Sequence, residues 1–110
     1  MTKLTFEDLR YANVQRTKEW DPDGKINALF RGLELAGEVG ELCNMIKKLE
    51  RERLGLKGSH VTLLELALEI ADVQITLDLL AMHYCIHIPE AVRLAFNSKS
   101  KEHSFLTKIE

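Results

Sequence analysis

Two rows of acidic residues occur along this chain with nearly the same spacing. At about 100° per residue, each trio would lie on a helical stripe roughly 60° wide. Apolar residues border both stripes, and carboxylates set among apolar neighbours are costly unless a cation joins them. A site for a hard metal ion is therefore the leading hypothesis, and a metal site implies chemistry. The rows are Glu34, Glu38 and Glu41, followed by Glu65, Glu69 and Asp72.

The last two acids of each row are suited to share one cation. Glu38 and Glu41 are three residues apart, and side chains at this spacing point to the same side of a helix. The same holds for Glu69 and Asp72. Four carboxylates make an oxygen-rich site that suits Mg²⁺, with Mn²⁺ as the alternative, and few imidazoles lie nearby to favour Zn²⁺. Because Mg²⁺ usually bridges protein carboxylates to phosphates, we expect a phosphate-ester or phosphoanhydride substrate.

Residues beside the first acid row could contact such a substrate. Lys48 follows Glu41 by two helical turns on the same face, where it could meet a phosphate or remain a plain surface lysine. Phe30 lies on the stripe before Glu34, and Trp20 ends the preceding helix. Either ring could stack on a nucleobase or pack into the core.

Turn and capping signals divide the chain into four predicted helices. A turn at 21–24, glycines at 55 and 58, and Pro89 separate them. Thr62 and Glu65 fit a capping box, so Glu65 could serve only as a cap partner. The predicted helices run over residues 5–20, 26–53, from 59 or 62 to 84, and 89–102.

The second and third predicted helices match in their apolar residues as well as in their acids. Packing of the two apolar flanks would bring the two acid rows face to face, as in a helical hairpin. Because no β alternation persists, we predict an all-α, four-helix bundle-like domain with a central helical hairpin. The matching flanks are Leu35, Val39, Leu42, Ile46 and Leu49, then Leu66, Ile70, Val73, Leu77 and Leu80.

Length and composition describe one ordinary soluble domain over residues 1–110, with 45% apolar and 29% charged residues. The net charge of −2 provides no field that would attract nucleic acid polymers or anionic membranes. Acids interrupt the longest apolar stretch, 61–88, which therefore predicts a buried helix rather than a membrane span. Without metal or redox spacing, Cys43 and Cys85 are expected to be buried, reduced thiols of a cytoplasmic protein.

These motifs resemble those of the MazG-like nucleoside triphosphate pyrophosphohydrolases, a family of all-α enzymes. The family signature is E-E-x-x-E, a spacer, and then E-x-x-D. The strings Leu35–Leu42, Glu69–Val73 and Ala95–Lys101 look typical, and the resemblance covers residues 20–101. One position departs from the signature, because Gly37 stands where the family has the first acid of the double-Glu element.

The resemblance implies Mg²⁺-dependent hydrolysis of a nucleoside or deoxynucleoside triphosphate to the monophosphate and pyrophosphate, by a metal-activated water. Asn97 and Lys101 would help to hold the phosphates. We hypothesise that Glu34, one turn before Glu38, orients the attacking water in place of the acid missing at Gly37. The first helix could add Asn13, Gln15 and Arg16 to a nucleoside pocket. The acids that match the family's metal ligands are Glu38, Glu41, Glu69 and Asp72.

The predicted apolar arcs exceed what one chain of this size can bury. This excess favours a homodimer or a dimer of dimers, which the resemblance also implies, and the nucleotide pocket could draw on a neighbouring subunit. Two alternatives stay open. The chain could be a non-catalytic helical interaction module that uses the acids as a structural or regulatory metal site. It could also be a related enzyme that acts on a damaged nucleotide or another phosphoanhydride.

Overall fold

The computed structural model describes residues 2–110, and this part of the chain contains four α-helices and no strand. The predicted all-α class is therefore confirmed, and every predicted helix is present within a few residues of its expected bounds. The helices are α1 (Phe6–Trp20), α2 (Ala28–Arg53), α3 (Leu63–His83) and α4 (Ile88–Glu102).

Polar side chains fix the starts of the first three helices. Thr5 and Asp8 form a full capping box at α1, in which each side chain accepts a backbone N–H of the other residue. Asn27 caps α2, and Thr62 caps α3 by accepting the N–H of Glu65 at 3.1 Å. The second hydrogen bond of the predicted capping box, in which the Glu65 carboxylate would accept the Thr62 N–H, is not formed among the described residues.

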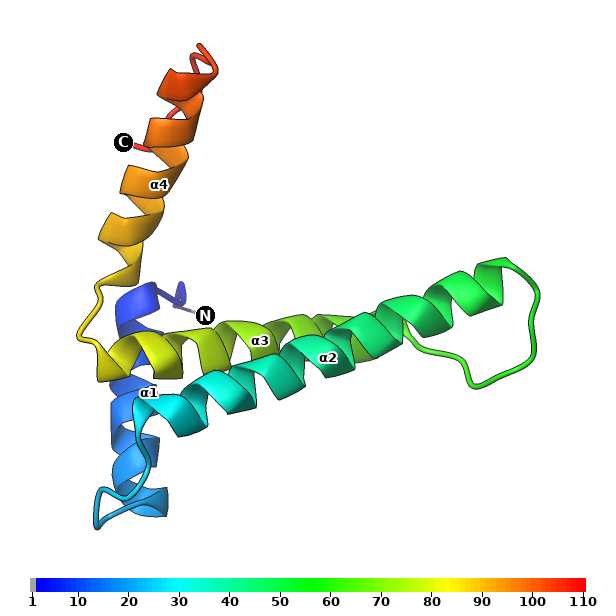
Figure 1. Cartoon of the computed structure of the whole chain (residues 1–110), viewed down its shortest axis with the longest axis horizontal. Coiled ribbons are helices and arrows are strands. Elements are labelled where there is room, and N and C mark those ends of the chain that lie inside the picture. The colour runs from blue at the N-terminus through cyan, green and yellow to red at the C-terminus, as the bar shows by residue number, and fades with distance from the viewer. Residues whose placement is uncertain (1) are drawn as a thin grey trace.

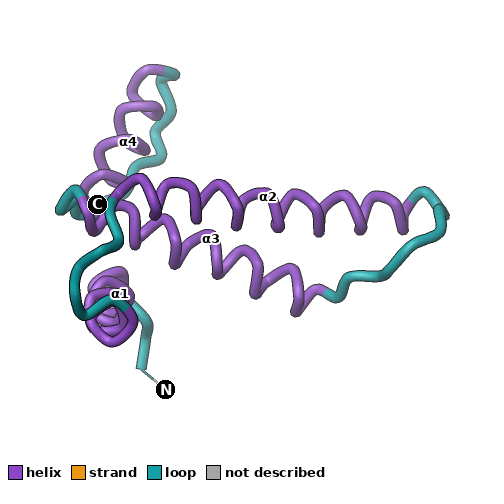
Figure 2. Tube along the Cα trace, turned by 60° about the horizontal axis from the view of Figure 1, so that its bottom comes forward, coloured by secondary structure: helices purple, strands orange, loops and turns teal. Residues whose placement is uncertain are grey.

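The centre of the fold is the predicted antiparallel hairpin of α2 and α3 (Figure 1). Helix α1 crosses α3 near the end of the hairpin that lies away from the α2–α3 loop, and Figure 2 shows it nearly end-on. A buried polar network joins α1 to α3. Asp78, which is 1% exposed, accepts hydrogen bonds from Arg10 Nε at 3.1 Å and from Asn13 Nδ2 at 2.9 Å.

Helix α4 turns away from the hairpin after a short connector and packs along none of the other helices (Figures 1 and 2). The described chain exposes 8591 Å², whereas a compact monomer of 12.6 kDa would expose roughly 6,200 Å². Its radius of gyration is 17.4 Å, against roughly 13 Å for a compact domain of this length. Side chains such as Leu33, Leu64 and Leu68, all more than half exposed, contribute to this excess.

The segment after α4 folds back along that helix. Asn97 donates from Nδ2 to the carbonyl of Ile109 at 2.8 Å, and its Oδ1 accepts the Ile109 N–H at 2.8 Å. Arg93 adds a bond from Nε to the Glu110 carbonyl at 3.0 Å. The Asn97 side chain therefore pairs with one backbone unit much as a neighbouring strand would.

Two further observations concern the cysteines and the apolar content of the helices. Cys43 and Cys85 are both free and both exposed, so the prediction that they are buried was wrong. Cys43 is exposed on α2, and Cys85 lies in the α3–α4 connector. Over the described residues, none of the helices has the length and apolar composition that a membrane crossing requires.

Candidate metal centre

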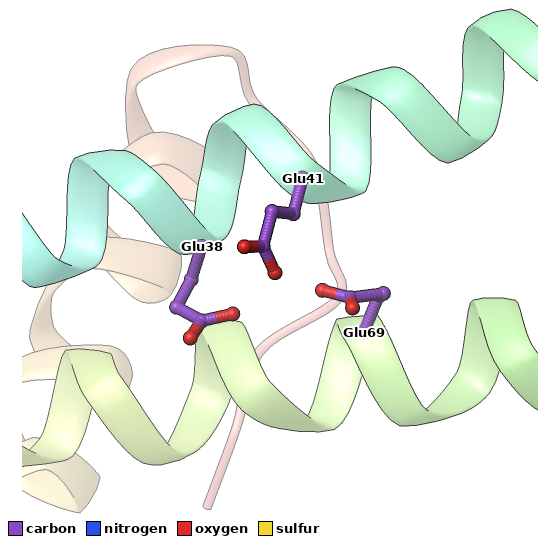
Figure 3. Close-up of side chains that lie close together, drawn as sticks. All are labelled: Glu38, Glu41 and Glu69. Carbon is purple, nitrogen blue, oxygen red and sulfur yellow. The ribbon is translucent and has the colours of Figure 1, made fainter.

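Three carboxylates meet between the two helices of the hairpin. Glu38 and Glu41 project from α2 and Glu69 projects from α3, so that one oxygen of each lies within 4.8 Å of the others (Figure 3). The i, i+3 spacing on α2 directs Glu38 and Glu41 to the same side, as the sequence predicted. The antiparallel packing of α3 then sets Glu69 opposite them. We call these three residues the acid cluster.

The acid cluster lacks a counter-charge. Among residues 2–110, no lysine, arginine or histidine forms an ion pair with any of its members. The Oε2 atoms of Glu38 and Glu69 are shielded from solvent and accept no hydrogen bond there. Buried polar oxygens without partners are rare in folded proteins, because their hydrogen bonds to water are lost on burial and no protein hydrogen bond replaces them.

The local electrostatics are those of crowded like charges. Removal from water raises the pKa of Glu38, and the charges of Glu41, Asp72, Glu69 and Glu34 raise it further. Removal from water likewise raises the pKa of Glu69, with added repulsion from Glu41 and Asp72. A cation bound among these oxygens would reverse both effects. The donor set, which is all carboxylate oxygen, fits Mg²⁺ or Mn²⁺ rather than a thiophilic metal.

Asp72, the fourth predicted ligand, lies at the edge of the acid cluster. It is exposed and does not belong to the group of three close oxygens. Its charge nevertheless acts on both Glu38 and Glu69, which places it nearby on α3. Its backbone carbonyl accepts the hydroxyl of Thr76 at 2.7 Å. The structure therefore brings together three of the four predicted ligands, with Asp72 beside them.

Glu34 lies outside the acid cluster and is held by an arginine. Arg31 Nη1 lies 2.9 Å from Glu34 Oε1, and Arg31 Nη2 donates to Thr17 Oγ1 at 3.2 Å. Arg31 is a functional candidate that the sequence analysis missed. The only sequence signal for Arg31 was its i, i+3 spacing from Glu34. This spacing is typical of surface ion pairs, so it did not predict that the Arg31 side chain would be only 3% exposed.

The predicted aromatic residues lie together at the junction of α1 and α2. The rings of Trp20 and Phe30 have centroids 6.1 Å apart and are tilted by 55°. Trp20 is 61% exposed, and the guanidinium carbon of Arg31 lies 5.8 Å from its ring centroid. Trp20 and Arg31 line a cavity of about 510 Å³, which Phe30 does not line.

The remaining predicted substrate contacts are not gathered at the acid cluster. Lys48 is half-buried on α2 and makes no hydrogen bond or ion pair with the rest of the described chain. Asn97 holds Ile109, and Lys101 lines a separate groove on α4 with Arg93. Because α4 diverges from the hairpin, the structure does not bring Asn97 or Lys101 to the three carboxylates within one chain (Figure 1).

Comparison with protein-family models, with curated protein sequences and with solved structures gives no significant match. The family resemblance of the sequence motifs therefore stays a prediction.

Proposed function

We propose that this protein is a Mg²⁺-dependent pyrophosphohydrolase that converts a nucleoside or deoxynucleoside triphosphate to its monophosphate and pyrophosphate. The observation that carries the proposal is the acid cluster, with two shielded oxygens that lack any hydrogen-bond partner within residues 2–110. The two-part acid motif and its resemblance to the MazG-like family supply the expected reaction.

In this proposal, Glu38, Glu41 and Glu69 hold the metal, and Asp72 completes the set from the edge of the cluster. A bound Mg²⁺ would supply charge neutralisation for the phosphates and a water of lowered pKa. Water attacks the α-phosphorus and releases a proton to the solvent, the bond from that phosphorus to the α–β bridging oxygen breaks, and pyrophosphate leaves. The chain's task is to fix the carboxylates in place, because the reaction requires no protein nucleophile.

The excess surface supports the predicted homodimer or dimer of dimers. The exposed area is roughly 2,400 Å² above that of a compact monomer, which is of the order that each chain buries in a permanent dimer. Association of this kind would also cover the open sides of the hairpin and of α4. A cytoplasmic location stays a prediction, with which two unpaired cysteines agree.

The direct test is a panel of the common NTPs and dNTPs, plus oxidised and deaminated nucleotides, incubated with Mg²⁺ and assayed for pyrophosphate. We expect turnover of at least one nucleotide, and its loss when EDTA replaces Mg²⁺. Glu38→Gln should abolish turnover while the helical circular-dichroism spectrum stays unchanged. Absence of turnover across the panel would refute the enzyme proposal. If Mg²⁺ still raised the melting temperature in that case, the non-catalytic module with a structural metal site would be favoured.

A further inference from the structure

A second site adjoins the acid cluster on the side of α1. The 510 Å³ cavity at the α1–α2 junction is lined from all three packed helices. Glu34 lines the cavity and precedes Glu38 by one helical turn, so the cavity and the acid cluster share one face of α2. The lining residues are Asn13, Arg16, Thr17, Glu19, Trp20, Arg31, Glu34 and Leu79.

The lining of this cavity is polar but has no net formal charge. Two arginines, Arg16 and Arg31, are balanced by two glutamates, Glu19 and Glu34. A subsite for phosphates would need a surplus of cations, whereas this cavity offers an exposed aromatic ring with donors and acceptors beside it. Such a composition suits a planar, uncharged, polar ligand that stacks and forms hydrogen bonds.

Arg31 fixes the polar wall of the cavity. Its guanidinium is almost fully buried and links Glu34 on its own helix to Thr17 on α1. One carboxylate oxygen of Glu34, Oε1, is engaged by Arg31, while Oε2 accepts no hydrogen bond from the described chain. Glu34 is 28% exposed, so the open oxygen can be reached from the cavity. Every nucleobase carries an N–H group that could donate a hydrogen bond to this oxygen.

We propose that this cavity is the nucleobase subsite of the enzyme proposed above. Trp20 stacks on the base, Glu34 accepts a hydrogen bond from an N–H group of the base, and Arg31 is a positioning residue that orients Glu34. This assignment rests on the proposed function for its substrate class. It gives Glu34 a role in recognition in place of the role in water activation that the sequence suggested.

The chain carries a built-in reporter for this subsite, because Trp20 is its only tryptophan. We would titrate the wild-type protein in Mg²⁺ with nucleoside monophosphates, and separately with inorganic pyrophosphate, while recording tryptophan emission. We expect a saturable change with at least one monophosphate and none with pyrophosphate. An equal response to pyrophosphate would instead identify a phosphate subsite and overturn the assignment.

The same titration separates this inference from the proposed reaction. Turnover without any change in Trp20 emission would leave the enzyme proposal intact and place the base elsewhere. A nucleotide-dependent change without turnover would support the subsite and count against hydrolysis. If neither turnover nor a change in Trp20 emission is observed, both proposals are overturned.

Kinetics of Glu34→Gln distinguish recognition from chemistry. Losing one hydrogen bond to a charged group should raise KM about tenfold or more, to different degrees for different bases, with kcat within about threefold of wild type. A fall in kcat of a hundredfold or more at unchanged KM would assign Glu34 to the attacking water instead. Unchanged kinetics would remove Glu34 from both roles.

Arg31→Lys tests the positioning role, because lysine keeps the charge but cannot bridge Glu34 and Thr17 with a planar fork. We expect the same KM change as in Glu34→Gln, and unchanged KM would contradict the role. The matched controls are Glu50→Gln and Arg53→Lys. These residues form an i, i+3 ion pair on α2 in the reverse order, and this pair is exposed and lies at the far end of the helix. If Arg31→Lys does not fold, Glu34→Gln still decides the proposal.

Discussion

Asn13 and Asp78 form a buried hydrogen bond of 2.9 Å that ties α1 to α3. Asp78 also pairs with Arg10, whose Nη2 lies 3.0 Å from Oδ1 and donates to the Ile86 carbonyl at 2.8 Å. Asp78 therefore joins α3 directly to α1, and through Arg10 to the α3–α4 connector, at the end of the hairpin that carries the proposed base subsite.

Replacing Asp78 should therefore destabilise the whole fold. Asp78→Ala removes the carboxylate that accepts hydrogen bonds from the buried Asn13 and the part-buried Arg10, a change that typically costs about 3–5 kcal/mol. Chemical denaturation measures the loss. Glu7→Ala is the control, because its contact with His87 at 3.5 Å is exposed. A similar small effect of both substitutions would show that the Asp78 network contributes little.

Glu38→Gln should stabilise the metal-free protein and remove its response to Mg²⁺. The substitution relieves repulsion among Glu38, Glu41 and Glu69, which repel one another in the absence of a cation. We expect a melting temperature roughly 2–5 °C above that of the metal-free wild type, by calorimetry in EDTA. Glu65→Gln, an exposed acid of the second row that is not in the cluster, should change neither the melting temperature nor the response to Mg²⁺. A lower melting temperature for Glu38→Gln would argue against a repulsive cluster.

Leu68→Glu should weaken self-association. Leu68 is 58% exposed on α3 and is one of the apolar side chains that contribute to the excess surface. A buried, unpaired charge at an interface is strongly unfavourable, so the sedimentation profile should shift toward the monomer. Leu106→Glu, at a tail residue that is 99% exposed, is the control and should leave the profile unchanged. A monomeric wild type at micromolar concentration would contradict the prediction directly.

Asn97→Ala should release the C-terminal segment from α4. The two hydrogen bonds between Asn97 and the Ile109 backbone would be lost, so the Ile109 amide should exchange its hydrogen at least about tenfold faster. Hydrogen exchange measured by NMR reports this amide directly. Ser98→Ala, next in sequence and exposed, is the control. Unchanged exchange at Ile109 would mean that the segment is held by other contacts.

Local signals in the sequence were sufficient for the helices and for most of the acid cluster. Thr5, Asn27 and Thr62 begin their helices with short-range hydrogen bonds, and Glu38 and Glu41 converge because of helical periodicity alone.

The matching apolar flanks predicted that the two acid rows face each other, but the other contacts between distant segments were not foreseen. Arg31 is buried where its guanidinium meets Thr17 on α1, and the side chain of Asn97 is occupied because the segment after α4 folds back along that helix. Both residues look like ordinary helix-surface positions until those long-range contacts form.

The position of the acid cluster has a consequence for folding. Glu41 and Glu69 belong to different helices, and the α2–α3 loop lies between them in the chain. A cation that joins them would act as a removable crosslink that closes a loop of about 27 residues. A covalent crosslink closing a loop of this length raises the free energy of unfolding by roughly 3–4 kcal/mol. The supply of divalent metal would then govern how long the chain stays folded as well as whether it reacts.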